Sequence, residues 1–253
     1  MKKKISVLIA VTLMCMAALT GCGSKQTSSA DKIVFATNAE FPPFEFISTN
    51  GVIGEYDGID IAIVKEIGER AGVEVEMQNM EFDSLLVALQ NGQIDATIAG
   101  MTVTEERAKS VDFSTPYYTA TQVMIVPEGS DIKAAADMAG KTIAVVQGYT
   151  GETVVQDLGF EYEAFKKGTE CVMELVNGKC DVVVIDSATA QKYVSDNKGL
   201  TIVEDPDAFA SEEYAIAVQK GNTELLNLIN GVVEEMLADG TISELSAKYI
   251  DAE

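Results

Sequence analysis

One ten-residue pattern occurs twice and constrains the fold more than any single predicted element. Positions 89–98 read LQNGQIDATI and positions 175–184 read LVNGKCDVVV, so both contain Leu-x-Asn-Gly-x-x-Asp followed by an apolar run. In each copy the Asn-Gly pair is expected to end a helix in a left-handed conformation, after which the chain turns directly into a buried strand. Two copies of one helix-to-strand unit predict two similar lobes.

The rest of the chain alternates short apolar runs with amphipathic patterns, which is typical of β-α units around mainly parallel sheets. We expect strands at 33–36, 73–77, 94–99, 123–126, 142–146, 181–185 and 214–218. We expect helices at 57–71, 82–90, 151–158, 169–176, 187–194, 223–238 and 242–249. The predicted fold class is α/β, with two lobes that are each a mainly parallel sheet flanked by helices and with a ligand cleft between them.

The composition excludes several classes of function. The chain has 40 acidic and 18 basic residues and a net charge of -22 at pH 7, and such a surface repels nucleic-acid phosphates. It contains no histidine, which removes Ser-His-Asp triads, Cys-His pairs and His-ligated zinc. We therefore expect no nucleic-acid partner and no His-ligated zinc site, and we assign no metal ligands.

The first 30 residues predict a processed and lipid-anchored N-terminus. Three lysines at 2–4 are followed by an uncharged stretch over 5–19 and by the tetrad LTGC, which ends at Cys22. A basic start, a short apolar segment and small residues before a cysteine are typical of a signal peptide, and the tetrad resembles a bacterial lipobox. We expect a lipoprotein signal peptide at 1–21, a diacylglyceryl anchor on Cys22 and a flexible linker at 22–30. An ordinary secretory signal with an incidental cysteine is the alternative.

A basic and an acidic side chain follow the apolar strands of the two repeated units. Arg107 comes shortly after the first of these strands, and Asp186 directly follows the second. Because ligands of α/β sheets bind beyond the carboxyl ends of the strands, both side chains are expected to face one crevice. A guanidinium and a lone carboxylate on opposite walls suit a zwitterion. Alternatively, Arg107 pairs with a neighbouring glutamate on an exposed helix and Asp186 only caps the helix that follows.

Segments spread over nearly the whole chain carry a resemblance to a known family. They lie at 36–45, 58–61, 99–118, 147–151, 181–186, 239–241 and 248–249, and the strongest match is AGMTVTEER at 99–107 with VDFSTPYY at 111–118. These segments resemble the extracellular solute-binding proteins of the polar amino acid uptake family, family 3, which includes the glutamine-, histidine- and arginine-binding receptors of ABC transporters. One departure is Ala62, where the family usually has a second acidic residue.

The resemblance implies a type II periplasmic-binding-protein-like fold whose lobes close around a ligand by a hinge motion. The crossings between the lobes would lie near 118–121 and 211–214. The first lobe would then comprise 31–118 and 214–253, and the second lobe would comprise 121–211.

The function implied is that of an extracytoplasmic receptor that delivers an L-α-amino acid to the permease subunits of an ABC transporter. The expected protein is a monomer without a cofactor or a catalytic residue. It would be held at the outer face of the bacterial cytoplasmic membrane by the lipid on Cys22.

The resemblance also assigns residues to the α-carbon groups of the ligand. Arg107 would hold the α-carboxylate, helped by Thr102 and by Thr150 of the other lobe. Asp186 would hold the α-ammonium together with the backbone carbonyl of Gly100.

Four further residues would surround the ligand side chain. Phe41 and Phe82 would enclose it, Asn38 would meet its polar end, and Gln147 would lie at the pocket edge; the two phenylalanines could instead be plain core aromatics. A neutral Asn38 favours an uncharged polar ligand, whereas Glu40 and the acidic net charge favour a cation, so both ligand classes stay open.

Two other functions fit the same fold. An amino acid-sensing receptor would use the same pocket without feeding a transporter. A dehydratase-like enzyme would need a general acid above its substrate, and Glu40 is the spare pocket-side candidate.

Overall fold

The structure is a computed structural model that describes residues 32–250. The predicted signal peptide, the Cys22 anchor and the linker lie outside these residues. Of the helices between residues 32 and 250, none combines the length and the apolar character that crossing a membrane requires.

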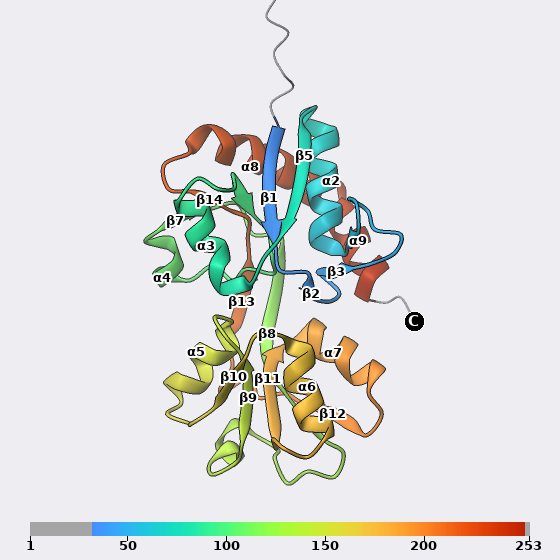
Figure 1. The fold of residues 1–253 in the computed structure, drawn as a ribbon, viewed down its shortest axis with the longest axis vertical. Coiled ribbons are helices and arrows are strands. Elements are labelled where there is room, and N and C mark those ends of the chain that lie inside the picture. The colour runs from blue at the N-terminus through green and yellow to red at the C-terminus, as the bar shows by residue number, and fades with distance from the viewer. Residues whose placement is uncertain (1–31, 251–253) are drawn as a thin grey trace, which may run out of the picture. The chain divides into compact units, whose positions relative to one another are not determined.

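The first of two main sheets has the strand order β5-β1-β6-β14-β7 (Figure 1). β1 (Lys32–Thr37) lies between β5 (Glu74–Asn79) and β6 (Ala96–Thr97) and is parallel to both. β14 (Ala217–Gln219) is antiparallel to β6 and to β7 (Val111–Phe113). A strand from near the C-terminus thus completes a sheet that the N-terminal part of the described chain begins.

The second main sheet has the order β10-β9-β11-β8-β12. β9 (Ile143–Val146) is parallel to both β10 (Glu163–Phe165) and β11 (Val182–Asp186). β8 (Tyr118–Pro127) is antiparallel to β11 and to β12 (Leu200–Val203). Each main sheet therefore has a core of three parallel strands and an antiparallel side.

Two strands connect the part of the chain that builds the first sheet with the part that builds the second. The start of β8 pairs with β13 (Ser211–Tyr214) in an antiparallel ladder that joins Tyr118 to Tyr214 and Thr121 to Ser211. The other strands of the second sheet, β9 to β12, all follow β8 and precede β13 in the chain.

The remaining elements are a small sheet and the helices. β2 (Glu40–Phe41), β3 (Glu45–Ile47) and β4 (Tyr56–Asp57) form an antiparallel three-stranded sheet. The helices are α2 (Ile59–Ala71), α3 (Phe82–Gln90), α4 (Glu105–Ala108), η1 (Ala135–Met138), α5 (Thr150–Asp157), α6 (Gly168–Val176), α7 (Ser187–Asp196), α8 (Thr223–Asp239) and α9 (Thr241–Ile250).

The repeated sequence pattern forms the same turn twice, as predicted. Gly92 and Gly178 follow the ends of α3 and α6 in left-handed conformations, with φ of 67° and 68°. The aspartate of each copy then fixes the neighbouring parallel strand. Oδ2 of Asp95 accepts a backbone N–H of β1 at 2.8 Å, and Oδ2 of Asp181 accepts the N–H just before β9 at 2.8 Å.

The observed elements differ from the predicted ones in two informative places. The predicted helix at 57–71 begins at Ile59, because Gly58 has a φ of 123° and lies so close to Phe44 that a Cβ would approach the carbonyl oxygen of Phe44 to 2.2 Å. The predicted strand at 214–218 is divided, because Tyr214 pairs with β8 whereas Ala217 pairs with β6 of the first sheet. One apolar run thus serves two sheets, which periodicity alone does not reveal.

Candidate ligand-binding site

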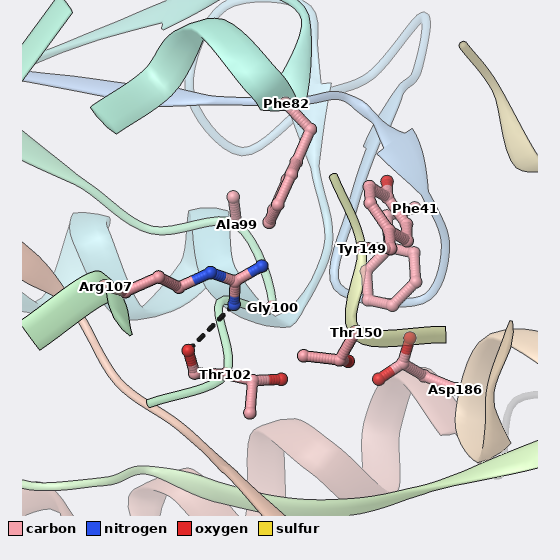
Figure 2. A pocket seen from close by; sticks show the side chains of 9 residues that line it. All are labelled: Phe41, Phe82, Ala99, Gly100, Thr102, Arg107, Tyr149, Thr150 and Asp186. Atoms are coloured by element: carbon pink, nitrogen blue, oxygen red, sulfur yellow. Dashed lines mark hydrogen bonds between the residues drawn. The ribbon is translucent and has the colours of Figure 1, made fainter. Parts of the chain in front are cut away.

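Nine residues line a small pocket with a cavity volume of about 10 Å³ (Figure 2), which is room for about one water molecule. They are Phe41, Phe82, Ala99, Gly100, Thr102, Arg107, Tyr149, Thr150 and Asp186. The structure therefore brings together seven of the residues that the sequence analysis proposed for ligand binding. Ala99 and Tyr149 were not among them.

Arg107 lies in α4, whose first turn is capped by the side chain of Thr104. Its Nη1 donates to the carbonyl oxygen of Thr102 at 2.8 Å, and its Nη2 donates to that of Gly148 at 2.9 Å. Its Cζ lies 5.3 Å from the ring centroid of Phe82, within the range of a cation–π contact. Burial lowers the pKa of the guanidinium, but an arginine at this position still carries its charge near neutral pH.

The glutamates beside Arg107 do not take up its charge. Glu106 pairs with Lys109, and within residues 32–250 no salt bridge to Arg107 is present. The guanidinium is thus held by neutral carbonyls and an aromatic face at the edge of a pocket, where a carboxylate of a ligand would complement it.

Asp186 is the last residue of β11 and is 3% exposed. Its Oδ1 accepts a hydrogen bond from the hydroxyl of Tyr214 at 2.5 Å, and its side chain makes no capping bond to α7. Burial raises the pKa of this carboxyl, and the nearby charge of Glu212 raises it further. A buried carboxylate without a cation gains most from a ligand that brings one. Figure 2 shows Asp186 and Arg107 reaching the pocket from opposite sides.

Glu212 connects the two threonines of the pocket, and the sequence analysis did not identify it. Its Oε2 accepts from the hydroxyls of Thr102 and Thr150, each at 2.7 Å. Gln122 donates to the hydroxyl of Thr150 at 3.1 Å. Because a hydroxyl has one proton, the threonines can donate to a ligand carboxylate only by rotating away from Glu212.

Gly100 sits where backbone and side chains approach closely. Its φ is 50°, and a Cβ at this position would lie 2.6 Å from the ring of Phe41. Its N–H donates to Oδ2 of Asp60 at 2.8 Å, and the same oxygen accepts from the hydroxyl of Tyr117 at 2.9 Å. The side chain of Asp60 therefore holds in place the backbone of Gly100, which lines the pocket.

Glu45 and Asp60 form a buried pair of acids in this region, each 0% exposed. Burial raises the pKa of Asp60 to about 7, and burial together with the charge of Asp60 raises the pKa of Glu45 well above its usual range. Both carboxyl oxygens of Glu45 lack a donor among the described residues. A proton on Glu45 that is shared with Asp60 would satisfy one oxygen of each residue.

Two residues proposed for ligand binding do not line the pocket. Asn38 is 3% exposed; its Nδ2 donates to the carbonyl oxygen of Met80, and its Oδ1 accepts from the hydroxyl of Tyr149, each at 3.1 Å. Gln147 is exposed, and its backbone N–H bonds to Phe165. Glu40, the acid considered for an enzyme, is also absent from the lining and pairs with Lys167 at 2.6 Å.

Comparison with known proteins gives one family and one fold. Residues 33–252 match the family model of the bacterial extracellular solute-binding proteins, family 3. The arginine-binding extracellular protein ArtP of Bacillus subtilis (strain 168) is 32% identical over 260 residues, which is 100% of both chains.

Solved structures agree with this result. The arginine-, lysine-, histidine-binding protein ArtJ of Geobacillus stearothermophilus is 36% identical, with a TM-score of 0.82 over 88% of this chain and 96% of that chain. An ancestral arginine-binding protein, solved bound to glutamine, is 43% identical, with a TM-score of 0.80 over 86% of this chain and 97% of that chain. The predicted fold class, a two-lobed α/β fold of the type II periplasmic-binding-protein kind, is thereby confirmed.

Proposed function

This chain belongs to the bacterial extracellular solute-binding proteins of family 3, and we propose that it binds an L-α-amino acid with a polar side chain and delivers it to the permease subunits of an ABC transporter. The resemblance that the sequence carries is thus confirmed at the level of the family. Family 3 consists of binding proteins, and the relatives named above bind amino acids.

The observation that carries this proposal is the pairing of Arg107 and Asp186 in one pocket. A free amino acid has a carboxylate and an ammonium on the same carbon, and these two side chains offer the complementary charges. Arg107 would take the carboxylate through its fork of N–H donors. Asp186 would accept from the ammonium, which would also compensate for the cost of burying its own charge.

The proposed binding motion is a closure of two lobes. We place residues 31–118 and 214–253 in the first lobe and residues 121–211 in the second. The antiparallel pair formed by β13 and the start of β8 supports this division, because it is where the chain passes between the two main sheets. Bending of this short ladder would move Asp186 and Thr150 relative to Arg107.

The chemical class of the ligand can be tested by thermal shift of ligand-stripped protein. We expect at least one polar L-amino acid to raise the Tm by about 5 to 10 °C at a concentration near one hundred times its dissociation constant. The decarboxylated amine of that amino acid should give no shift, because it lacks the carboxylate for Arg107. The D-enantiomer should give no shift, because its side chain would point in the wrong direction once both α-groups were on Arg107 and Asp186. No shift with any L-amino acid, or an equal shift with the decarboxylated amine, would contradict the proposed function.

The lipid anchor is the second part of the proposal. The tetrad that ends at Cys22 supports it, and a diacylated cysteine carries two acyl chains, which suffice for stable anchoring. We expect cells grown with an alkyne-labelled fatty acid to label the wild-type protein and to leave Cys22→Ser unlabelled. Ser24→Ala, two residues further along the proposed linker, is the control and should label fully. An unlabelled wild-type protein would refute the anchor without affecting the proposed ligand.

A further inference from the structure

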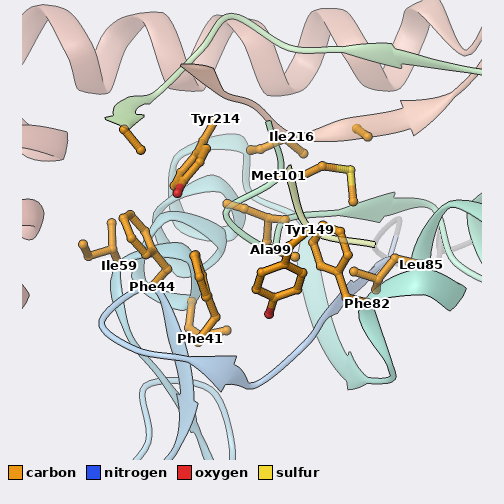
Figure 3. Close-up of a cluster of buried hydrophobic side chains, with 14 of the residues drawn as sticks. Phe41, Phe44, Ile59, Phe82, Leu85, Ala99, Met101, Tyr149, Tyr214 and Ile216 are labelled. Carbon is orange, nitrogen blue, oxygen red and sulfur yellow. The ribbon is translucent and has the colours of Figure 1, made fainter. Parts of the chain in front are cut away.

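Tyr149 occupies the place where a ligand side chain would be expected. Figure 3 shows its ring between those of Phe41 and Phe82. We propose that Tyr149 determines the specificity of the pocket by filling the side-chain subsite between these two phenylalanines, so that a long amino acid side chain has to displace its ring. This inference rests on the proposed function, because it concerns the same amino acid pocket.

The ring contacts leave no space for a second flat group in this position. The ring centroid of Tyr149 lies 5.3 Å from that of Phe41 at 89° and 4.6 Å from that of Phe82 at 63°. Both are edge-to-face contacts at the usual separation of packed aromatic rings. The three rings are 6%, 2% and 8% exposed in the order Tyr149, Phe41 and Phe82. A guanidinium or an amide could enter between the phenylalanines only if Tyr149 left.

The hydroxyl of Tyr149 makes the hydrogen bond to Asn38 that the polar end of a ligand side chain would be expected to make. Its hydroxyl donates to Oδ1 of Asn38 at 3.1 Å, while Nδ2 of Asn38 donates to the carbonyl oxygen of Met80. Burial raises the pKa of Tyr149 well above its usual range, so the hydroxyl stays a neutral donor. Asn38 is therefore satisfied by Tyr149, which explains why it is buried behind the pocket lining.

The backbone of Tyr149 is fixed beside the proposed carboxylate anchor. Its neighbour Gly148 has a φ of 81°, accepts from Arg107 through its carbonyl oxygen at 2.9 Å, and donates its N–H to Glu152 at 2.6 Å. The next residue, Thr150, begins α5 and lines the pocket. The ring can leave the subsite by side-chain rotation while this backbone stays in place, or by lobe opening, which would also separate Gly148 from Arg107.

Two classes of amino acid should therefore behave differently. Serine or alanine needs the α-carbon anchors and little more, so Tyr149 can stay between the phenylalanines. Glutamine or arginine needs the volume of its ring and the oxygen of Asn38. Removal of the ring is expected to favour the long ligands selectively.

Calorimetry of ligand-stripped wild type, Tyr149→Ala and Tyr149→Phe with L-alanine, L-serine, L-glutamine and L-arginine tests this. We expect Tyr149→Ala to raise the affinity for glutamine and arginine at least tenfold relative to that for alanine and serine. Tyr149→Phe should change this relative affinity in the same direction but less, because the ring remains and only the hydrogen bond to Asn38 is lost. Tyr149→Phe also keeps the test valid if the alanine variant does not fold.

Tyr193→Ala is the matched control. Tyr193 is another buried tyrosine and lies in α7. Its hydroxyl donates to the backbone oxygen of Glu40 at 3.2 Å, yet it does not line the pocket. Its loss should change all affinities by a similar factor.

Other outcomes overturn the inference. If Tyr149→Ala bound glutamine and arginine more weakly than wild type, the ring would be a surface that contacts the bound side chain. If the affinities for the long and the short amino acids kept their wild-type ratio, the ring would not occupy the subsite. In both cases the proposed function would stand. If none of the four amino acids bound to wild type or to any variant, this inference would fail, and the proposed function would fail with it only if no L-amino acid raised the Tm in the thermal-shift experiment.

Discussion

Replacing Arg107 by alanine is expected to abolish amino acid binding while the protein stays folded. Truncation of one member of a buried charge pair costs about 2 to 5 kcal/mol, which corresponds to an increase of the dissociation constant of about 30-fold to several thousand-fold. Asp186→Ala should have an effect of the same size from the other end of the ligand. Arg107→Lys should also bind poorly, because a lysine cannot form two parallel hydrogen bonds to a carboxylate.

Stability should change little in Arg107→Ala. The guanidinium contacts two backbone carbonyls and the ring of Phe82, and no carboxylate of the described residues depends on it for a salt bridge. Calorimetric titration together with thermal unfolding of the same sample separates loss of binding from loss of fold.

Arg70→Ala is the control for this prediction. Arg70 lies in the last turn of α2, is not among the residues that line the pocket, and bonds to Glu66, Asp239 and Thr241. Its removal should lower stability and leave affinity unchanged, which is the opposite of the expected result for Arg107. Near-wild-type affinity in Arg107→Ala or in Asp186→Ala would remove that residue from the proposed anchors.

What the sequence predicted well depends on local geometry. The Asn-Gly turns are set by the conformational freedom of Gly92 and Gly178, which any sequence pattern of this kind reveals. The positions of Arg107 and Asp186 follow from a general rule about the ends of strands in α/β sheets. The rule alone left open that Arg107 pairs with a neighbouring glutamate and that Asp186 only caps a helix, and the resemblance to family 3 favoured the pocket.

What the sequence did not predict depends on contacts between distant segments. Tyr149 stands before a helix, and only the fold brings its ring to Phe41 and Phe82, which precede it by many residues. Glu212 left a weak signal. Glu212 stands two residues before Tyr214 in β13, so both side chains point to the same face of the strand. Tyr214 in turn contacts Asp186.

The buried acids Glu45 and Asp60 were the hardest to foresee. Acidic side chains are almost never fully buried unless they are paired, so neither residue is expected in a core. Asp60 follows Ile59 at the start of α2, where the helix is buried on all sides. Its buried carboxyl group is stabilised because the N–H of Gly100 and the hydroxyl of Tyr117 both donate to it.

This pair predicts that the protein loses stability as the pH rises from about 4 to about 7. In the folded state the pKa of Asp60 is raised to about 7 and that of Glu45 lies well above its usual range, both chiefly because of burial. The folded state therefore binds more protons than the unfolded chain in this interval, and the free energy of unfolding falls with pH. Each pKa unit corresponds to about 1.4 kcal/mol, so the expected loss is a few kcal/mol.

Surface acids act in the opposite direction but at lower pH. Salt bridges and hydrogen bonds lower the pKa values of Asp83, Asp112 and Asp131, and that of Asp239 to about 2. Their contribution to stability is lost only as the pH falls through these lowered values. Denaturant unfolding measured from pH 4 to pH 8 should therefore show its steepest decline between about pH 5 and about pH 7, where the unfolded chain has lost its carboxyl protons and the buried acids of the folded state still hold theirs.

Glu45→Gln separates the buried pair from all other acids. A glutamine keeps the shape of the side chain, offers an N–H donor to Asp60 and cannot ionise, so the free energy of unfolding should depend less on pH between 4 and 8 and should be higher than wild type at pH 8. The remaining slope comes from Asp60 and from Asp186, whose pKa is also raised by burial. Glu76→Gln is the control, because Glu76 is an exposed acid whose pKa is lowered by its bond to Lys32. If Glu45→Gln kept the wild-type slope, Glu45 would not be the proton-binding member of the pair, and the proton would lie on Asp60, whose Oδ2 still accepts from the N–H of Gly100.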